Sequence, residues 1–244
     1  MGAHMCTIIR GPRDETEVFP PARERAKIHP NRTPEQTRIT HRPVHMPHAF
    51  VLASGSEIRA TLLRNAGLSV EAIPARVDED AIKAAMLDEG AKPRDVADAL
   101  AEHKARRVSA KHPEAFVLGC DQVAEVRGKL VSKPETPDAA RVQLRELSQH
   151  THKLLSAAVI CSAGQPIWRH VGVVRLTMRE LSDAYIDDYV ARNWESIRHS
   201  VGGYKLEEEG VRLVSRIDGD YFTVLGLPLT ELLSYLIDRG ELAI

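Results

Sequence analysis

Hydrophobic residues over most of the chain fall into two patterns that alternate along it. Short apolar runs, at residues 50–53 and 115–120, have the length and composition of buried strands. Between them, apolar residues recur at helical spacing, as at Val96, Leu100 and Val108, which share one face of a helix. Alternating strands and helices predict an α/β fold.

The same two patterns, with capping and turn residues, predict the other elements. Apolar runs separated by Ala163-Gly164-Gln165-Pro166 indicate an antiparallel hairpin, and Thr136, Ser182 and Gly240 mark helix ends. The predicted strands are 68–73, 154–161, 167–178 and the alternating stretch 211–215, and the predicted helices are 81–87, those opening at Pro93, Pro137 and Ser182, and the final one around 232–237.

The first 48 residues follow neither pattern. Residues 1–5, Met-Gly-Ala-His-Met, resemble an expression-vector remnant, and the stretch after them is rich in Pro, Arg, His and Glu. Such a composition buries little apolar surface. We therefore expect residues 1–48 to be a remnant followed by a disordered extension, and residues 49–244 to form the folded domain.

Composition narrows the possible classes of function. The chain has 244 residues, of which 43% are hydrophobic, so it can build a substantial core. A net charge of −1 and 5% aromatic residues argue against a nucleic-acid-binding module. The three cysteines have no paired spacing, no apolar run approaches the roughly 20 residues of a membrane span, and no signal peptide is recognisable. These features lead us to expect a cytoplasmic protein that neither spans a membrane nor binds nucleic acid.

The first predicted strand runs directly into a small, hydroxyl-rich turn and a helix. Ser54, Gly55 and Ser56 form the turn, and Arg59 lies in the first turn of the helix. Backbone N–H groups at a helix N-terminus bind anions, and an arginine there adds a forked donor. An ordinary strand–turn–helix with a serine cap has the same sequence pattern, so this stretch leaves both interpretations open.

Charged residues in unusual positions are the other candidates for chemistry. Lys104 interrupts the apolar face of its helix, where it either performs a function or extends its ammonium group to solvent. Asp121 follows a buried strand, and ligands of open α/β sheets gather beyond such strand ends. The further candidates are Glu79, Lys133, Lys205 and Glu207. Cations that hold phosphates and carboxylates that hold a divalent ion are what nucleotide chemistry requires.

Seven short segments carry a family resemblance, in the family's order. Residues 52–63 resemble the opening L-A-S-x-S-P-x-R-x-x-L-L motif of the Maf nucleotide pyrophosphatases. The other segments are Val77-Asp78-Glu79, Gly119-Cys120-Asp121-Gln122-Val123, Lys133-Pro134, Leu147-Ser148 with Thr151-His152, Val201-Gly202-Gly203-Tyr204, and residues 224–229. Together they cover residues 49 to about 240.

The resemblance implies an α/β fold with a mixed, twisted sheet and two lobes around a deep cleft, as in inosine-triphosphate pyrophosphatases. It also implies a cytoplasmic, often dimeric enzyme that cleaves a nucleoside triphosphate between the α and β phosphates, using Mg²⁺ or Mn²⁺. By motif position, Asp121 is the catalytic carboxylate and a metal ligand, and Glu79 is a second metal ligand. The residues that grip the substrate phosphates are Ser54, Arg59, Lys104 and Lys133.

Base-facing positions divide the family into two branches. Gln122 and Glu207 are similar to the branch that prefers 7-methyl-GTP, whereas the branch that prefers dTTP and UTP has Thr and Gln there. This chain also departs from the motifs: Glu57 replaces a usual Pro, and Ile58 stands where the 7-methyl-GTP branch often has Trp. The alternatives are a dTTP/UTP pyrophosphatase and, because the family is associated with septum formation, a non-catalytic regulator.

Overall fold

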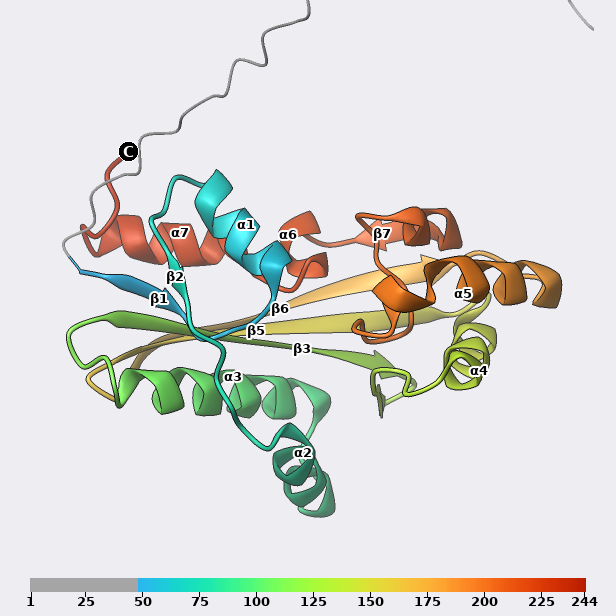
Figure 1. Ribbon diagram of the computed structural model, residues 1–244, viewed down its shortest axis with the longest axis horizontal. Helices are drawn as coiled ribbons and strands as arrows, with labels where there is room; N and C mark the ends of the chain where they lie inside the picture. The colour runs from blue at the N-terminus through green and yellow to red at the C-terminus, as the bar shows by residue number, and fades with distance from the viewer. Residues whose placement is uncertain (1–47) are drawn as a thin grey trace, which may run out of the picture. The chain divides into compact units, whose positions relative to one another are not determined.

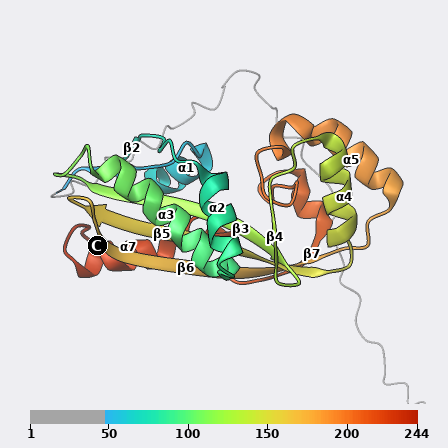
Figure 2. The same ribbon diagram turned by 90° about the horizontal axis from the view of Figure 1, so that it is seen from below.

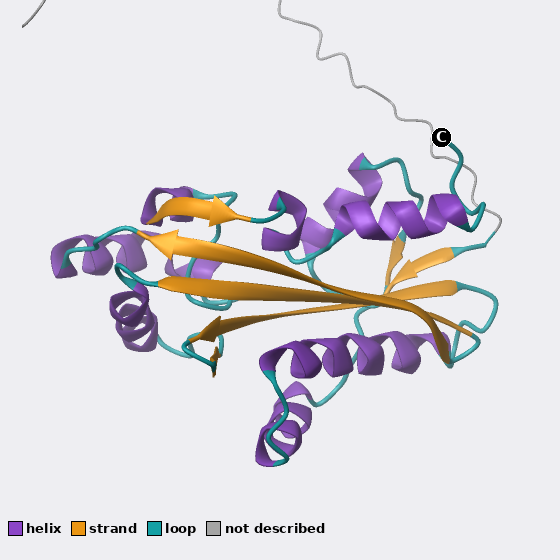
Figure 3. Ribbon diagram, turned by 180° about the vertical axis from the view of Figure 1, so that it is seen from behind, coloured by secondary structure: helices purple, strands orange, loops and turns teal. Residues whose placement is uncertain are grey.

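The computed structural model describes residues 48–244, so the expectation for the N-terminal extension lies outside the described part except at His48. Seven strands form one sheet in the order β2-β1-β3-β5-β6-β7, with β4 paired to β3 (Figures 1 and 3). The strands are β1 Phe50–Leu52, β2 Glu71–Ala72, β3 Phe116–Val126, β4 Lys129–Val131, β5 Thr151–Ser162, β6 Gln165–Met178 and β7 Val214–Asp218. The mixed α/β prediction is confirmed.

The sheet changes from parallel to antiparallel pairing at its longest strands. Strands β1, β2 and β3 are parallel, whereas β3, β5, β6 and β7 pair antiparallel. The predicted hairpin is confirmed as β5 and β6, although β6 begins earlier, at Gln165. Ala163 and Gly164 close its turn, both with positive φ.

Helices cover both faces of the sheet (Figures 1 and 3). On one face, α1 Glu57–Asn65, α6 Tyr221–Val224 and α7 Leu229–Asp238 lie over β1, β3 and β5; on the other lies α3 Pro93–Ser109, with α2 Glu79–Asp88 beside it. Successive side chains of β5 point to opposite faces of the sheet and so contribute to both layers. Ala158 and Ile160 pack toward α1 and α7, while Ala157 and Val159 pack toward α3.

A separate core lies at the far end of the long strands (Figure 2). There α4 Pro137–Leu147, α5 Asp183–Ile197 and the 3₁₀ helix η1 Glu209–Leu213 surround a cluster that includes Leu144, Tyr189 and Tyr204. Thr136 and Ser182 cap α4 and α5 through their side chains, as predicted. The expected two lobes are thus two helical groups that share one set of strands.

Two predicted strands differ from the structure. The stretch 68–73 contains only the two-residue strand β2. Both of its residues are exposed, and they pair only with Val51 and Leu52 of the short strand β1. In the stretch 211–215, residues up to Leu213 form η1 and the strand starts at Val214. Alternating apolar residues fit a 3₁₀ turn and a strand equally well over so short a length.

Candidate active site

One edge of β3 is left open in its middle. Strand β1 pairs with residues 116–118 and β4 pairs with residues 124–126 along that edge. In the described part of the chain, no strand covers residues 119–123 between them. Asp121 and Gln122, whose side chains point to opposite faces, can therefore both line a cavity at this gap.

Asp121 does not end its strand, which corrects the sequence-based prediction. It lies in the middle of β3 and pairs with Ala157 of β5. The prediction placed it at a strand end because the apolar run stops there. The strand that ends is its parallel neighbour: β1 stops at Leu52, opposite Leu118. Asp121 thus lies just beyond the end of the parallel part of the sheet.

Gly119 lets α3 approach this part of β3 very closely. A Cβ atom at Gly119 would lie 2.1 Å from the carbonyl oxygen of Ala101 and 2.6 Å from the backbone nitrogen of Ala105. Glycine is therefore required where helix and strand meet. Lys104 lies on the same helix between these contacts, and its ammonium group reaches Asp121 two residues along β3.

Lys104 joins two carboxylates. Its Nζ lies 2.6 Å from Asp121 Oδ1 and 2.7 Å from Glu79 Oε1, and Lys104 and Asp121 are both buried. The alternative in which Lys104 extends into solvent is therefore wrong. The second oxygen of Asp121, Oδ2, has no hydrogen-bond partner among residues 48–244.

Glu79 reaches this pair from the first turn of α2, which Asp78 caps by accepting from Ala81 N–H. Burial raises the pKa of Glu79, but the hydrogen bond and charge of Lys104 outweigh that effect. The nearby charges of Lys133 and Lys83 act in the same direction, so the pKa stays below its ordinary value. Glu79 is consequently ionised at neutral pH.

The turn before α1 is held by Ser54 and Arg59. Ser54 Oγ accepts from the backbone N–H of Ser56 and from Arg59 Nη1, each at 3.2 Å. Arg59 also donates to the carbonyls of Gly226 and Cys120, at 2.8 and 3.2 Å. Ser56 occupies the N-cap position without a side-chain cap, which leaves the first N–H groups of α1 available to an anion.

Gln122 is fixed with a defined orientation of its amide. Its Nε2 donates to Ser156 Oγ and to the carbonyl of Val224, both at 2.9 Å, and lies 3.2 Å from the carbonyl of Thr223. Carbonyl oxygens can only accept, so the nitrogen must face them. The amide oxygen of Gln122 is thereby left as an acceptor at the cavity.

The acidic run at residues 207–209 separates into different roles. Glu208 accepts from Ser196 and Lys205, and Glu209 pairs with Arg192 and Arg212. Glu207 is exposed and makes no hydrogen bond or ion pair within the described residues. Glu207 is also the member of the run that lines the cavity.

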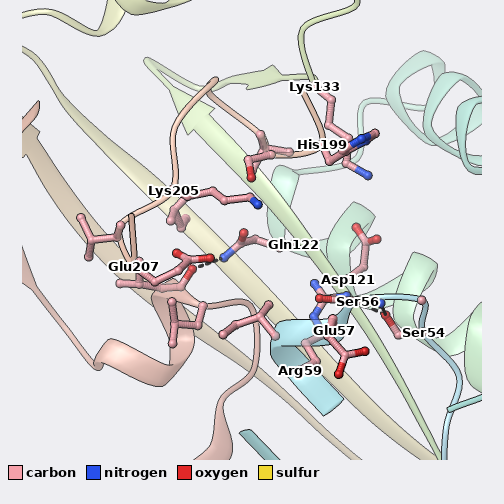
Figure 4. Close-up of a pocket in the computed structure, with 18 of the residues that line it drawn as sticks. Ser54, Ser56, Glu57, Arg59, Asp121, Gln122, Lys133, His199, Lys205 and Glu207 are labelled. Atoms are coloured by element: carbon pink, nitrogen blue, oxygen red, sulfur yellow. Dashed lines mark hydrogen bonds between the residues drawn. The ribbon is translucent and has the colours of Figure 1, made fainter. Parts of the chain in front are cut away.

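The candidate site residues line one cleft of about 580 Å³ (Figure 4). The structure brings together every residue predicted for the site: Ser54, Ile58, Arg59, Glu79, Lys104, Asp121, Gln122, Lys133 and Glu207. Figure 4 shows Ser54, Arg59 and Asp121 on one side of the cleft, with Gln122 and Glu207 on the other.

Sequence reasoning missed two residues of the cleft, His199 and Ser200, which follow α5. Ser56 and Glu57, which the sequence analysis placed in the turn and in the opening motif, also contribute to the lining. Lys205 was a candidate only by its charge, and its Nζ is bonded to Ser196 Oγ at 2.7 Å and Glu208 Oε1 at 3.1 Å. His199 and Ser200 lie in the irregular loop after α5, where no sequence pattern indicated that they face the cleft.

The carboxylates of Glu79 and Asp121 fit a divalent cation. One oxygen of each already converges on a single positive atom, Lys104 Nζ. Hard cations such as Mg²⁺ take oxygen ligands, often one or two carboxylates together with substrate phosphates. Within residues 48–244, no group of three or more His, Cys, Asp or Glu side chains is arranged to hold a metal, so phosphates would complete the ligand set.

A profile of the family described as "Maf-like protein" matches residues 49–239, nearly the whole described part of the chain. The chain belongs to the Maf family. The match begins and ends close to the boundaries of the α/β fold, and the nine predicted site residues lie within it.

Maf relatives are similar to this chain over almost their full length. The "Nucleoside triphosphate pyrophosphatase" of Roseobacter denitrificans is 64% identical over 197 residues, which are 81% of this chain and 99% of that protein. That of Ruegeria pomeroyi is 63% identical over 191 residues, 78% and 96% of the two chains. The "7-methyl-GTP pyrophosphatase" of Mesorhizobium japonicum is 46% identical over 197 residues, again 81% and 99%.

None of the helices in residues 48–244 combines the length and apolar character that crossing a membrane requires.

Proposed function

We propose that this Maf protein hydrolyses nucleoside triphosphates between the α and β phosphates, giving a monophosphate and pyrophosphate, and that it prefers 7-methyl-GTP or a related guanine nucleotide. The observation that carries the proposal is the composition of one cleft. It joins a buried carboxylate, Asp121, and a half-buried one, Glu79, with several cations and two acceptor side chains that suit a base. The names of the relatives support the pyrophosphatase activity.

The triphosphate would lie against α1 and the cations. The first N–H groups of α1, Arg59 Nη2 and the Lys133 ammonium group have no partner within the described residues, so they can receive phosphate oxygens. Arg59 is already held by two backbone carbonyls, so little conformational entropy is lost when its remaining donors bind a phosphate.

Asp121 is the proposed general base. A water attacks the α phosphorus and gives its proton to Asp121 Oδ2. The bond from the α phosphorus to the bridging oxygen breaks, pyrophosphate departs with that oxygen, and the monophosphate keeps the water's oxygen. In the structure without substrate, Lys104 holds the other oxygen, Oδ1. A divalent cation held by Glu79 and Asp121 would neutralise phosphate charge.

Glu207 and Gln122 are the proposed readers of the base. An ionised carboxylate accepts two hydrogen bonds, and guanine presents adjacent N1–H and N2–H donors. Methylation at N7 adds positive charge to the ring, which strengthens bonds to a carboxylate. Ile58 lines the cleft where relatives of this branch often carry Trp, so cation–π stacking is absent at this position and discrimination is expected to be loose.

The test is kcat/KM for 7-methyl-GTP, GTP, UTP and dTTP, with wild type and with Glu207→Gln combined with Gln122→Thr. We expect wild type to prefer the guanine nucleotides and the double variant to lose that preference, because one mismatched polar group costs about 1–3 kcal/mol. A wild-type preference for UTP or dTTP would assign the chain to the other branch. No pyrophosphate release from any nucleotide would favour the non-catalytic regulator.

Metal dependence, a homodimeric state and a cytoplasmic location remain predictions from the family resemblance.

A further inference from the structure

The point where Glu79 and Asp121 converge already contains a positive charge. Lys104 Nζ lies 2.7 Å from Glu79 Oε1 and 2.6 Å from Asp121 Oδ1. Two carboxylates that share a site repel each other unless a cation lies between them. The ammonium group therefore occupies the position that a metal bridging the same two oxygens would need.

The geometry suits either cation but not both at once. Mg²⁺ and its oxygen ligands lie about 2.1 Å apart, so the two carboxylates would need to close by only about half an ångström each. An ammonium nitrogen left at its present place would then lie within contact distance of the metal. Metal entry between these oxygens requires that Lys104 move away.

A tethered ammonium is a strong competitor for a free ion. Its stem is fixed to α3, which packs directly on β3 at Gly119, so its effective concentration at the carboxylates is high. The pair of carboxylates and Lys104 carry only one net negative charge. Within residues 48–244, no third acidic, His or Cys ligand joins them to favour the metal.

We propose that Lys104 blocks the metal position in the free enzyme and leaves it when a triphosphate arrives. The phosphates offer the ammonium group new acceptors and bring further ligands for the metal. Metal and substrate therefore bind together, and the free enzyme binds metal weakly. This inference rests on the proposed function, since it concerns the same carboxylates.

The test is a titration of the nucleotide-free protein with Mn²⁺, followed by electron paramagnetic resonance of the unbound ion. We expect Lys104→Gln to bind Mn²⁺ at least tenfold more tightly than wild type. Lys83→Met is the matched control: Lys83 Nζ lies 3.8 Å from Glu79 Oε2 and is not close to Asp121, so removing it takes away one charge without opening the shared position. It should bind Mn²⁺ within about twofold of wild type.

Two further variants keep the test decisive if Lys104→Gln is poorly folded. Lys104→Arg keeps the charge and should bind Mn²⁺ as weakly as wild type. Adding Asp121→Asn to Lys104→Gln removes one of the converging carboxylates and should abolish the gain. If Lys104→Gln is unfolded without metal, Mn²⁺ should restore its thermal transition, because a ligand of the native state stabilises it.

Equal Mn²⁺ affinity in wild type and folded Lys104→Gln would overturn the inference, as would an equal gain in Lys83→Met. Failure of the proposed function is a separate result: wild type would then release no pyrophosphate from any nucleotide in the presence of Mn²⁺, whatever the titrations show.

Discussion

Replacing Gly119 with alanine should damage both the stability and the chemistry of this protein. The added methyl group would lie 2.1 Å from the Ala101 carbonyl oxygen and 2.9 Å from Ala105 Cβ. Ordinary contacts begin near 3.5 Å, so α3 must retreat from β3 by about 1 Å or more. The nearest atoms belong to the helix backbone and cannot rotate away.

The expected loss of stability follows from overpacking, and the expected loss of activity follows from the position of Lys104 on the same helix. Overpacking a core costs about 1–3 kcal/mol, which for a domain of this size lowers Tm by about 2–12 °C. The retreat of α3 also displaces Lys104 within the cleft that contains Asp121. A misplacement of about 1 Å in an active site can cost about 100-fold in rate.

Thermal denaturation and kcat measured on the same preparation test this expectation. Gly55→Ala is the control for stability, because its Cβ would lie 3.6 Å from Pro74 Cγ, an ordinary contact. If Gly119→Ala kept the Tm and kcat of wild type, close packing of α3 on β3 would not be what sets the position of Lys104.

Four other changes have defined outcomes. Asp121→Asn should lower kcat by about 10²–10⁴-fold with little change in Tm, because an amide cannot accept the proton; a wild-type rate would rule out the role of Asp121 as base. Tyr204→Phe breaks the buried 2.6 Å hydrogen bond between the tyrosine hydroxyl and a histidine of β5 and should cost about 1–2 kcal/mol in urea denaturation. Tyr185→Phe should not destabilise, because the Tyr185 hydroxyl is buried with no hydrogen-bond partner among residues 48–244. The pKa of Glu79 lies below its ordinary value of 4.5 in the folded state, so ionised Glu79 stabilises the fold above pH 4.5. This contribution disappears as the pH falls through the folded-state pKa. The Tm difference between wild type and Glu79→Gln should therefore shrink in acid. Removing residues 1–45, which precede the family match, should leave Tm and kcat unchanged, and a fall in either would give that segment a role in the domain.

The helices and the central strands of this protein are predictable from its sequence because their signals are local. The apolar face of α3, the opening prolines of α3 and α4 and the capping side chains of Thr136 and Ser182 each act within a few residues. The strand 116–126 is recognisable from its apolar first half. The helices appear close to their predicted bounds, whereas β3 continues beyond the predicted run 115–120, as far as Val126.

The arrangement of the site depends on contacts that no local pattern contains. The open edge of β3 exists because β1 is only three residues long and β4 pairs further along. The bond between Lys104 and Asp121 requires α3 to cross β3 at Gly119, which hydrophobic spacing does not specify. The resemblance to Maf proteins named nine residues that line one cleft, but it did not show that Lys104 lies between the two carboxylates.

Analysis of the products by ion-exchange chromatography tests the central claim most directly. Purified protein would be incubated with 7-methyl-GTP or GTP and Mg²⁺, beside the Asp121→Asn variant. The account predicts equal amounts of nucleoside monophosphate and pyrophosphate with wild type, and a strongly reduced yield with the variant. Release of a nucleoside diphosphate and inorganic phosphate, or equal turnover by wild type and variant, would contradict it.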